Sequence, residues 1–149
     1  MIKKINDNKK FCLDLLLLGD EQESMIDKYL NRGEMFALFD NDTLKTVCVV
    51  TDEGQGICEL KNIATYPQFQ GQDCGKEVVN FLLEYYKNKY HTMIVGTGDA
   101  PTTINFYKRC GFKESHRIKN FFIDNYDHLI FEEGNQLIDM IYFSKKLSR

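Results

Sequence analysis

The chain has 149 residues, of which 43% are hydrophobic and 28% charged, and its net charge is −3. This length and composition predict one soluble globular domain over residues 1–149 and exclude a disordered or fibrous chain. The negative balance argues against a nucleic-acid-binding protein, which usually carries a basic surface.

The five cysteines are scattered along the chain, without a CxxC motif or a Cys–His cluster. An odd number with this spacing predicts neither a disulfide framework nor a zinc site, so we expect no metal. Residues 1–7 lack the apolar core of a signal peptide, and the apolar run at 15–18 is too short to span a bilayer. We therefore expect a cytoplasmic protein in a reducing compartment, with no membrane or nucleic-acid partner.

The first part of the chain predicts two short helices and then three strands. Residues 9–19 are crowded with apolar side chains and end at a glycine, which is typical of a short buried helix. Asp20 is expected to cap the next helix, because Glu23 follows at the capping-box spacing, and Gly33 should close that helix. Runs rich in apolar and β-branched residues, separated by turns, then predict an antiparallel meander. Its strands are residues 35–39, 43–51 and 57–65.

The pattern changes after the third strand. A loop over residues 66–73 leads into a helix that opens at Gly75 and carries apolar residues at helical period. A short strand at 92–95, a helix with Pro101 in its first turn and a last strand at 137–143 follow. This order predicts a mixed α/β (α+β) fold, with parallel pairing only near the middle of the sheet.

The strand, loop and helix over residues 63–79 have the features of an anion site. A glycine-containing loop can turn several N–H groups toward one point, and the following helix start adds unpaired N–H groups and positive partial charge. A diphosphate would bind there, with Lys76 supplying a full charge. An ordinary strand-to-helix turn is the alternative, and the loop by itself does not decide between them.

Residues 62–76 resemble the acetyl-CoA signature of the GNAT acetyltransferases. That signature is Arg or Gln, two residues, Gly, one residue, then Gly or Ala. Gln70 stands at its first position and Gly75 at its last, whereas Asp73 replaces the middle glycine. Asp tolerates a positive φ better than most residues, so we expect the turn to form, although a carboxylate beside a pyrophosphate is unfavourable.

A second match follows, in which Asn105, Tyr107 and the pair Gly111-Phe112 resemble the helix and next strand of the same family, with a shorter Asn–Tyr interval. The resemblance implies the GNAT acyl-CoA N-acyltransferase fold, a mostly antiparallel mixed sheet flanked by helices. It also implies acetyl-CoA-dependent transfer to a primary amine of a small molecule or peptide, and it allows a homodimer. Because of Asp73, a non-catalytic acyl-CoA-binding regulatory module stays open as the alternative.

The resemblance also implies roles for individual residues. Tyr107 would protonate the departing thiolate, because a phenol with a pKa of about 10 is protonated at neutral pH. Glu59 would accept the proton of the amine through a water. A core aromatic and a strand glutamate are the alternatives for these two residues. Cofactor contacts are expected from Ile63, Ala64, Thr65, Gln70, Gly71, Gln72, Asp73, Cys74, Gly75, Lys76, Asn105 and Tyr107.

Residues 121–134 combine aromatic and acidic side chains. Aromatic faces and carboxylates together bind cationic amines. We expect Phe122, Tyr126 and Glu132 to contact the acceptor. An ordinary loop with packed aromatics and solvated acids has the same composition and is the alternative.

Overall fold

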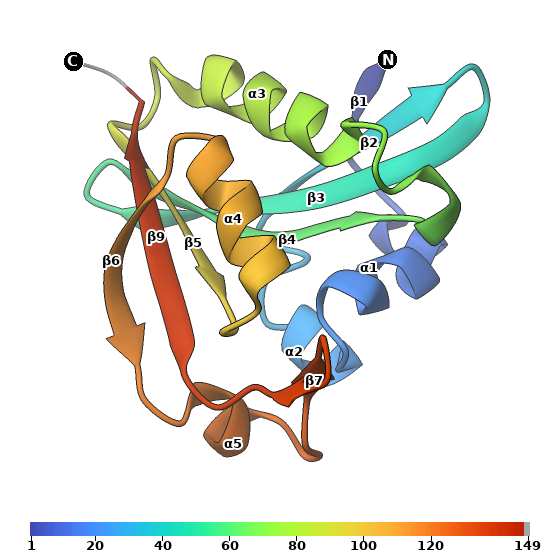
Figure 1. Ribbon diagram of the computed structural model, residues 1–149. Helices are drawn as coiled ribbons and strands as arrows, with labels where there is room; N and C mark the ends of the chain where they lie inside the picture. Colours follow the sequence, from blue (N-terminus) through green and yellow to red (C-terminus); the bar gives the residue numbers. More distant parts are fainter. Residues whose placement is uncertain (148–149) are drawn as a thin grey trace.

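A seven-stranded sheet organises the computed structural model, which describes residues 1–147 (Figure 1). Every neighbouring pair of strands is antiparallel except β4 and β5, which are parallel. This confirms the predicted fold class and the predicted place of the parallel pair. The strands lie in the order β1 (Ile2–Ile5), β2 (Glu34–Asp40), β3 (Thr43–Gly54), β4 (Ile57–Thr65), β5 (Thr92–Thr97), β9 (Met140–Lys146) and β6 (Lys113–Ile118).

Helices cover both faces of this sheet. In β3, Cys48 and Val50 belong to one apolar cluster and Val47 and Val49 to another, as strand alternation requires. The first cluster packs against α3 (Cys74–Tyr86) and α4 (Pro101–Arg109), which Figure 1 shows in front of the sheet. The second packs against α1 (Leu13–Gly19) and α2 (Glu23–Ile26). The remaining elements are the 3₁₀ turns η1 (Lys9–Cys12) and η2 (Pro67–Phe69), α5 (Phe121–Asn125), and a hairpin of β7 (Phe131–Glu132) and β8 (Asn135–Gln136).

The parallel pair β4–β5 separates partway along its length. Its register runs from Ile57 opposite Thr92 to Leu60 opposite Val95 and goes no further. At the same point β4 carries a bulge, because Val49 and Val50 of β3 pair with Asn62 and Leu60 and leave Lys61 without a partner. A bulge adds a residue and bends the strand. The far ends of β4 and β5 are therefore free to line a cleft.

Several expected boundaries are wrong. Asp20 does not cap a helix: the N-cap of α2 is Gln22, no side chain caps it, and α2 ends at Ile26 well before Gly33. The last strand is β9, which begins at Met140, because Leu137 packs instead in a small cluster with Phe122 and Ile130. The N-terminal strand β1 was not expected, since its four residues carry no repeating pattern beyond two isoleucines.

Two expectations concern membrane segments and the extent of the domain. None of the helices within residues 1–147 is both long and apolar enough to cross a bilayer. The expected domain, 1–149, includes residues 148 and 149, which lie outside the described part.

Candidate active site

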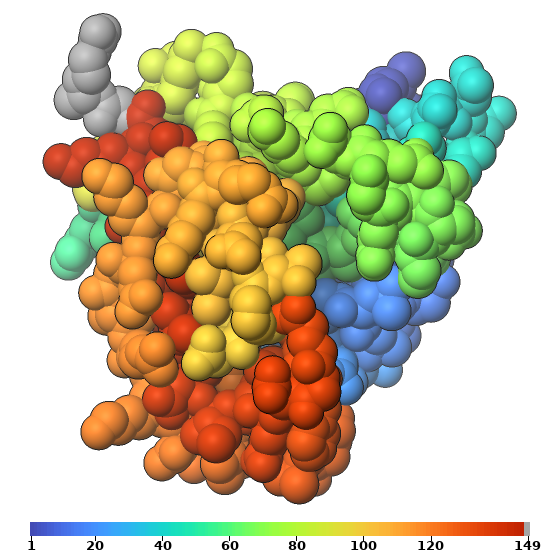
Figure 2. Space-filling view, viewed as in Figure 1, coloured from blue at the N-terminus to red at the C-terminus, as the bar shows by residue number. Residues whose placement is uncertain are grey.

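Two cavities meet where β4 and β5 separate. The larger, about 470 Å³, lies between the loop before α3 and the helix α4, and we call it the loop cavity. Figure 2 shows its mouth as a hollow between these segments. The smaller, about 200 Å³, extends toward α1 and α5, and we call it the inner cavity. The two cavities share three lining residues, Ile63, Thr103 and Tyr107. They are therefore adjacent, and ligands bound in the two cavities would approach each other beside Tyr107.

The loop before α3 presents main-chain donors to the loop cavity. Asp73 precedes the helix at φ 63°, in the left-handed region, so the expected turn forms without the family's glycine. The first backbone hydrogen bond of α3 runs from the Glu77 N–H to the Asp73 oxygen (2.9 Å). Among the described residues, the N–H groups just before Glu77 thus lack a carbonyl partner, as at any helix start. Gln70 connects the loop to the end of β4, because its Nε2 donates a hydrogen bond to the backbone carbonyl oxygen of Thr65 (3.0 Å).

The charges around the loop cavity are mostly positive. Lys76 and Arg109 line it, together with the Asp73 carboxylate. Cys74 and Cys110 line it as well; burial raises the pKa of the Cys110 thiol, against the effect of the nearby Lys76 and Arg109. Two cations and a helix N-terminus suit a polyanion such as a diphosphate.

Most of the predicted cofactor residues line the loop cavity, but three do not. Ala64 packs in the second apolar cluster, on the opposite face of β4 from Ile63. Asn105 is exposed on α4, and Gln72 is exposed with its Nε2 toward the Gln68 oxygen (3.4 Å). Those that line the cavity are Ile63, Thr65, Gln70, Gly71, Asp73, Cys74, Gly75, Lys76 and Tyr107.

Sequence reasoning missed the part of this wall that α4 provides. Three α4 residues and its C-cap follow one another at helical spacing and line the loop cavity: Thr103, Phe106, Tyr107 and Cys110. Thr102 and Arg109 line it beside this face, whereas Asn105 lies on another face. The i, i+3, i+4, i+7 pattern from Thr103 would have identified this face of the helix. The missed residues are Phe69, Thr102, Thr103, Phe106, Arg109 and Cys110.

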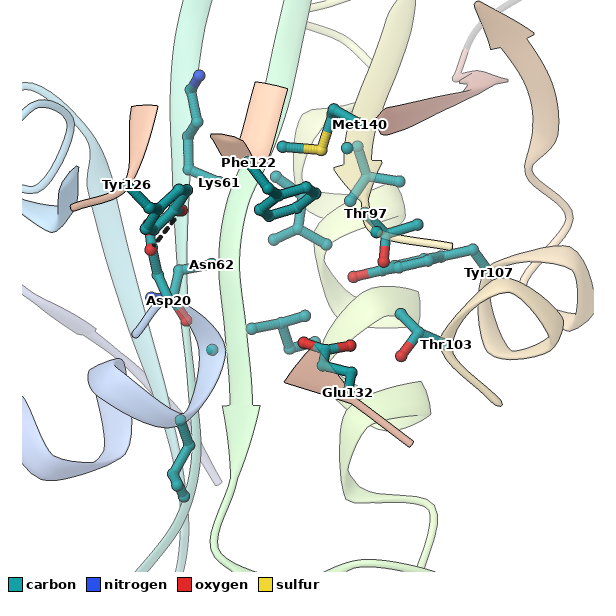
Figure 3. A pocket seen from close by; sticks show the side chains of 17 residues that line it. Asp20, Lys61, Asn62, Thr97, Thr103, Tyr107, Phe122, Tyr126, Glu132 and Met140 are labelled. Carbon is teal, nitrogen blue, oxygen red and sulfur yellow. Dashed lines mark hydrogen bonds between the residues drawn. The ribbon is translucent and has the colours of Figure 1, made fainter. Parts of the chain in front are cut away.

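Tyr107 stands at the junction of the two cavities. Its ring is 5% exposed and packs edge-on against Phe106 and Phe112. Its hydroxyl points into the inner cavity, near Thr97 and Thr103 in Figure 3, and it makes no hydrogen bond to another described residue. Burial raises the pKa of Tyr107, and the charges of Cys110 and Glu132 raise it further, so the phenol stays protonated at neutral pH.

Glu59 is buried next to the inner cavity, outside the residues that line it. The Tyr142 hydroxyl donates to Glu59 Oε2 (3.1 Å), and Lys61, which does line the cavity, pairs with the same oxygen (3.2 Å). Burial raises the pKa of Glu59 above its ordinary value, while the nearby Lys61 ammonium opposes this. A carboxyl with a raised pKa can exchange protons nearer to neutral pH.

The other wall of the inner cavity carries the predicted acceptor residues. Phe122, Tyr126 and Glu132 all line it, and the rings of Phe122 and Tyr126 stack 5.6 Å apart. Glu132 belongs to the β7–β8 hairpin, where its neighbour Glu133 accepts hydrogen bonds from the hydroxyl and the N–H of Thr102 at the start of α4. Glu132 is exposed at the edge of the cavity, where partial desolvation and the like charges of Glu21 and Glu133 raise its pKa.

Asp20 is an unexpected member of this wall. It lines the inner cavity and accepts hydrogen bonds from the hydroxyls of Tyr126 (2.6 Å, dashed in Figure 3) and Tyr29 (3.0 Å). Burial raises the pKa of Asp20, and these two bonds oppose the rise. No sequence pattern indicates this role, because an Asp before a helix is typical of an N-cap. No group of three His, Cys, Asp or Glu side chains suited to a metal occurs within residues 1–147.

Comparison with known proteins identifies the family. Residues 31–114 match the model of the acetyltransferase (GNAT) domain. The chain is 35% identical over 130 residues to the uncharacterized N-acetyltransferase YvbK of Bacillus subtilis, covering 86% of this chain and 84% of that protein.

Solved structures give the same answer over nearly the whole chain. A GNAT family acetyltransferase from Elizabethkingia anophelis with acetyl-CoA bound superposes with a TM-score of 0.93 at 32% identity, covering 98% of this chain and 97% of that one. A Bacillus subtilis acetyltransferase in complex with CoA has a TM-score of 0.90 at 31% identity, covering 97% of each chain. The split sheet, the donor loop and the matches together show that the chain belongs to the GNAT family of acetyltransferases.

Proposed function

We propose that this protein transfers the acetyl group of acetyl-CoA directly to a primary amine of a small molecule or peptide. One observation carries the proposal: a cavity lined by main-chain donors and two cations opens, at a buried tyrosine, into a second cavity lined by aromatics and carboxylates. The first suits a nucleotide-like polyanion and the second a cationic amine. The two similar enzymes with acetyl-CoA or CoA bound support the first half.

The residues of the loop cavity fit the coenzyme. The free N–H groups between Gln70 and Lys76 would bind its diphosphate, with Lys76 and Arg109 adding charge-assisted contacts. Beyond Leu60, β4 has no partner on the β5 side, so the main chain at Ile63 and Thr65 is available to pair with an extended amide chain. Bound acetyl-CoA supplies a thioester as the acetyl donor.

Two proton transfers remain for the protein. Tyr107, protonated and without a hydrogen-bond partner in the described part of the chain, donates to the leaving sulfur. Glu59 accepts the proton of the amine through a water beside Lys61. No residue needs to carry the acetyl group, so the amine attacks the thioester directly.

The acceptor approaches from the inner cavity. At about 200 Å³ this cavity lies below the roughly 300–1,000 Å³ of sites for drug-sized ligands, so it admits a small amine or one side chain of a peptide. Phe122 and Tyr126 offer ring faces, and Glu132 offers a carboxylate.

The test is release of free CoA thiol from acetyl-CoA by the purified protein in the presence of a panel of amines. Tyr107→Phe keeps the ring and its packing and removes only the hydroxyl. We expect it to lower kcat about 10²–10⁴-fold, the usual contribution of one general acid, and to leave the Kd for CoA unchanged. If CoA binds and no amine promotes thiol release, the regulatory acyl-CoA-binding module replaces this proposal.

A further inference from the structure

The inner cavity has two chemically different ends. At one end lie Tyr107 and Thr103, which the loop cavity shares. At the other end lie Asp20 and Tyr126, on the opposite side of β4 in Figure 3. An amine that reacts beside Tyr107 therefore extends toward Asp20. The side chains at that far end therefore affect which amines bind well.

The far end is built to hold a carboxylate in place. Tyr29 reaches Asp20 from nine residues along the chain and Tyr126 from 106 residues away, each donating its hydroxyl to a different oxygen. Both oxygens retain lone pairs, since a carboxylate has about four acceptor positions. The two phenols fix the side chain before any ligand arrives, which reduces the entropy lost on binding.

A second acceptor lies in the same wall. Asn62 lines the inner cavity, is 3% exposed, and donates its Nδ2 to the Leu16 oxygen (3.0 Å) and to Tyr29 (3.1 Å). Its Oδ1 is the one buried side-chain oxygen or nitrogen without a partner among residues 1–147. This oxygen faces Gly19, next to Asp20 in the chain. Asn62 Oδ1 is itself buried against Gly19, so the acceptors that this end offers to a ligand are the Asp20 oxygens, which match a group made only of donors, such as an ammonium.

The charge of the cavity has the sign that such a group requires. The acidic or basic side chains that line it are Asp20, Glu132 and Lys61. Lys61 pairs with Glu59, which is outside the lining, and its charge also opposes the rise that burial causes in the pKa of Asp20. Among residues 1–147, neither Asp20 nor Glu132 forms an ion pair of its own, so two carboxylates face the cavity against one shared cation. One of them lies at each end, with Glu132 toward Thr103 and Asp20 toward Tyr126 (Figure 3).

We infer that Asp20 binds a second cationic group of the acceptor, away from the nitrogen that is acetylated, so that diamines and other doubly cationic amines are the preferred substrates. This rests on the proposed function, because the reacting nitrogen is taken to lie at Tyr107. Asp20 thus determines specificity, and the N-terminal helices contribute directly to substrate choice.

The experiment compares putrescine with aminobutanol, which replaces one ammonium by a hydroxyl at nearly the same length. Binding to the CoA-loaded protein is measured by calorimetry, and thiol release from acetyl-CoA is measured separately. We expect wild type to bind putrescine at least about tenfold more tightly, the usual effect of one charge-assisted hydrogen bond. Asp20→Asn keeps the shape of the side chain and removes its charge, so the two Kd values should become similar.

Asp14→Asn is the matched control. Asp14 lies on α1, the helix whose C-cap is Asp20, and it accepts a hydrogen bond from the Tyr66 hydroxyl (3.0 Å). It lies outside both cavities, and its replacement by Asn changes the net charge equally. The preference should survive in this variant. Equal binding of the two amines to wild type, or loss of the preference in both variants alike, overturns the inference. A retained preference without thiol release overturns the proposed catalysis and leaves the Asp20 site standing.

Discussion

At the scale of single residues, Glu59 combines a buried carboxylate with a hydrogen-bonded tyrosine and a lysine, and its raised pKa affects activity and stability in opposite directions. A base acts only when ionised, so kcat/KM should rise with pH through the raised pKa. Stability has the reverse dependence: it is highest below the unfolded-state pKa and falls as pH rises through the folded-state pKa, because burial disfavours the ion.

Glu59→Gln tests both effects. We expect kcat/KM at neutral pH to fall about 10²-fold or more, with loss of the acidic limb of the pH profile. We expect the melting temperature to rise relative to wild type at neutral pH and this gain to disappear in acid. Glu53→Gln is the comparison. Burial there is outweighed by hydrogen bonds from Thr51 and Arg32, which lower the pKa of Glu53, so this variant should lose stability at neutral pH. An unchanged pH profile in Glu59→Gln would remove Glu59 from the mechanism.

Asp73 is the second residue whose chemistry can be separated from its conformation. Its φ of 63° suits Asn equally, while its carboxylate stands among the donors of the loop cavity. Asp73→Asn should therefore keep the turn and strengthen CoA binding about two- to fivefold, since a charge at a helix N-terminus contributes about 0.3–1 kcal/mol. Glu77→Gln removes the other acid of the first turn, away from both cavities, and should leave the Kd unchanged. Weaker binding by Asp73→Asn would contradict this account.

At the scale of elements, the contact between α1 and β4 depends on one glycine. A Cβ on Gly19 would lie 2.2 Å from Asn62 Oδ1, so Gly19→Ala must push α1 away from the strand. Overpacking of this kind costs about 1–3 kcal/mol, and each kcal/mol lowers the melting temperature by about 2–4 °C.

A double-mutant cycle identifies the cause. Asn62→Ala removes the clashing oxygen, so Gly19→Ala should cost less in that background than in wild type, and thermal melting of the four proteins measures the difference. Strictly additive losses would show that the helix end, and not its contact with β4, is what Gly19 supports.

Elements whose pattern is local were predictable from the sequence. α3 buries Val78, Val79 and Leu82 at helical spacing, and β3 is a run rich in β-branched residues that a turn with Gly56 joins to β4. The start of β9 was not predictable, because Leu137 is apolar in either setting and only its contact with Ile130 and Phe122 decides that it lies outside the strand.

The candidate site also has parts that the sequence predicts and parts that it does not. The donor loop was predictable, since a strand, a glycine-containing turn and a helix in succession define it. The bulge at Lys61 was not, because a strand register becomes visible only beside its partner β3. The role of Asp20 was not predictable either. It depends on a hydrogen bond from Tyr126, 106 residues away, and no local pattern encodes such a contact.

At the scale of the whole molecule, segments from the early, middle and late parts of the chain meet around one cleft. The loop and α4 from the middle of the chain provide the coenzyme side, and the N-terminal α1 and the C-terminal segment from Phe122 to Met140 provide the other. The first apolar cluster extends from β2 and β3 across the sheet to β5 and β9, so neither half of the sheet has a core of its own. The site and the fold therefore depend on the same set of contacts.

This shared core predicts one cooperative unfolding transition, as expected of a single domain over residues 1–149. The protein has no tryptophan and eight tyrosines, so far-UV circular dichroism and tyrosine fluorescence should report coincident melting curves. Saturating CoA should shift both curves together: at 100 times Kd the native state gains about 2.7 kcal/mol, or roughly 5–11 °C in melting temperature. Two separated transitions, with only one shifted by CoA, would mean that the cleft joins two independently folding parts.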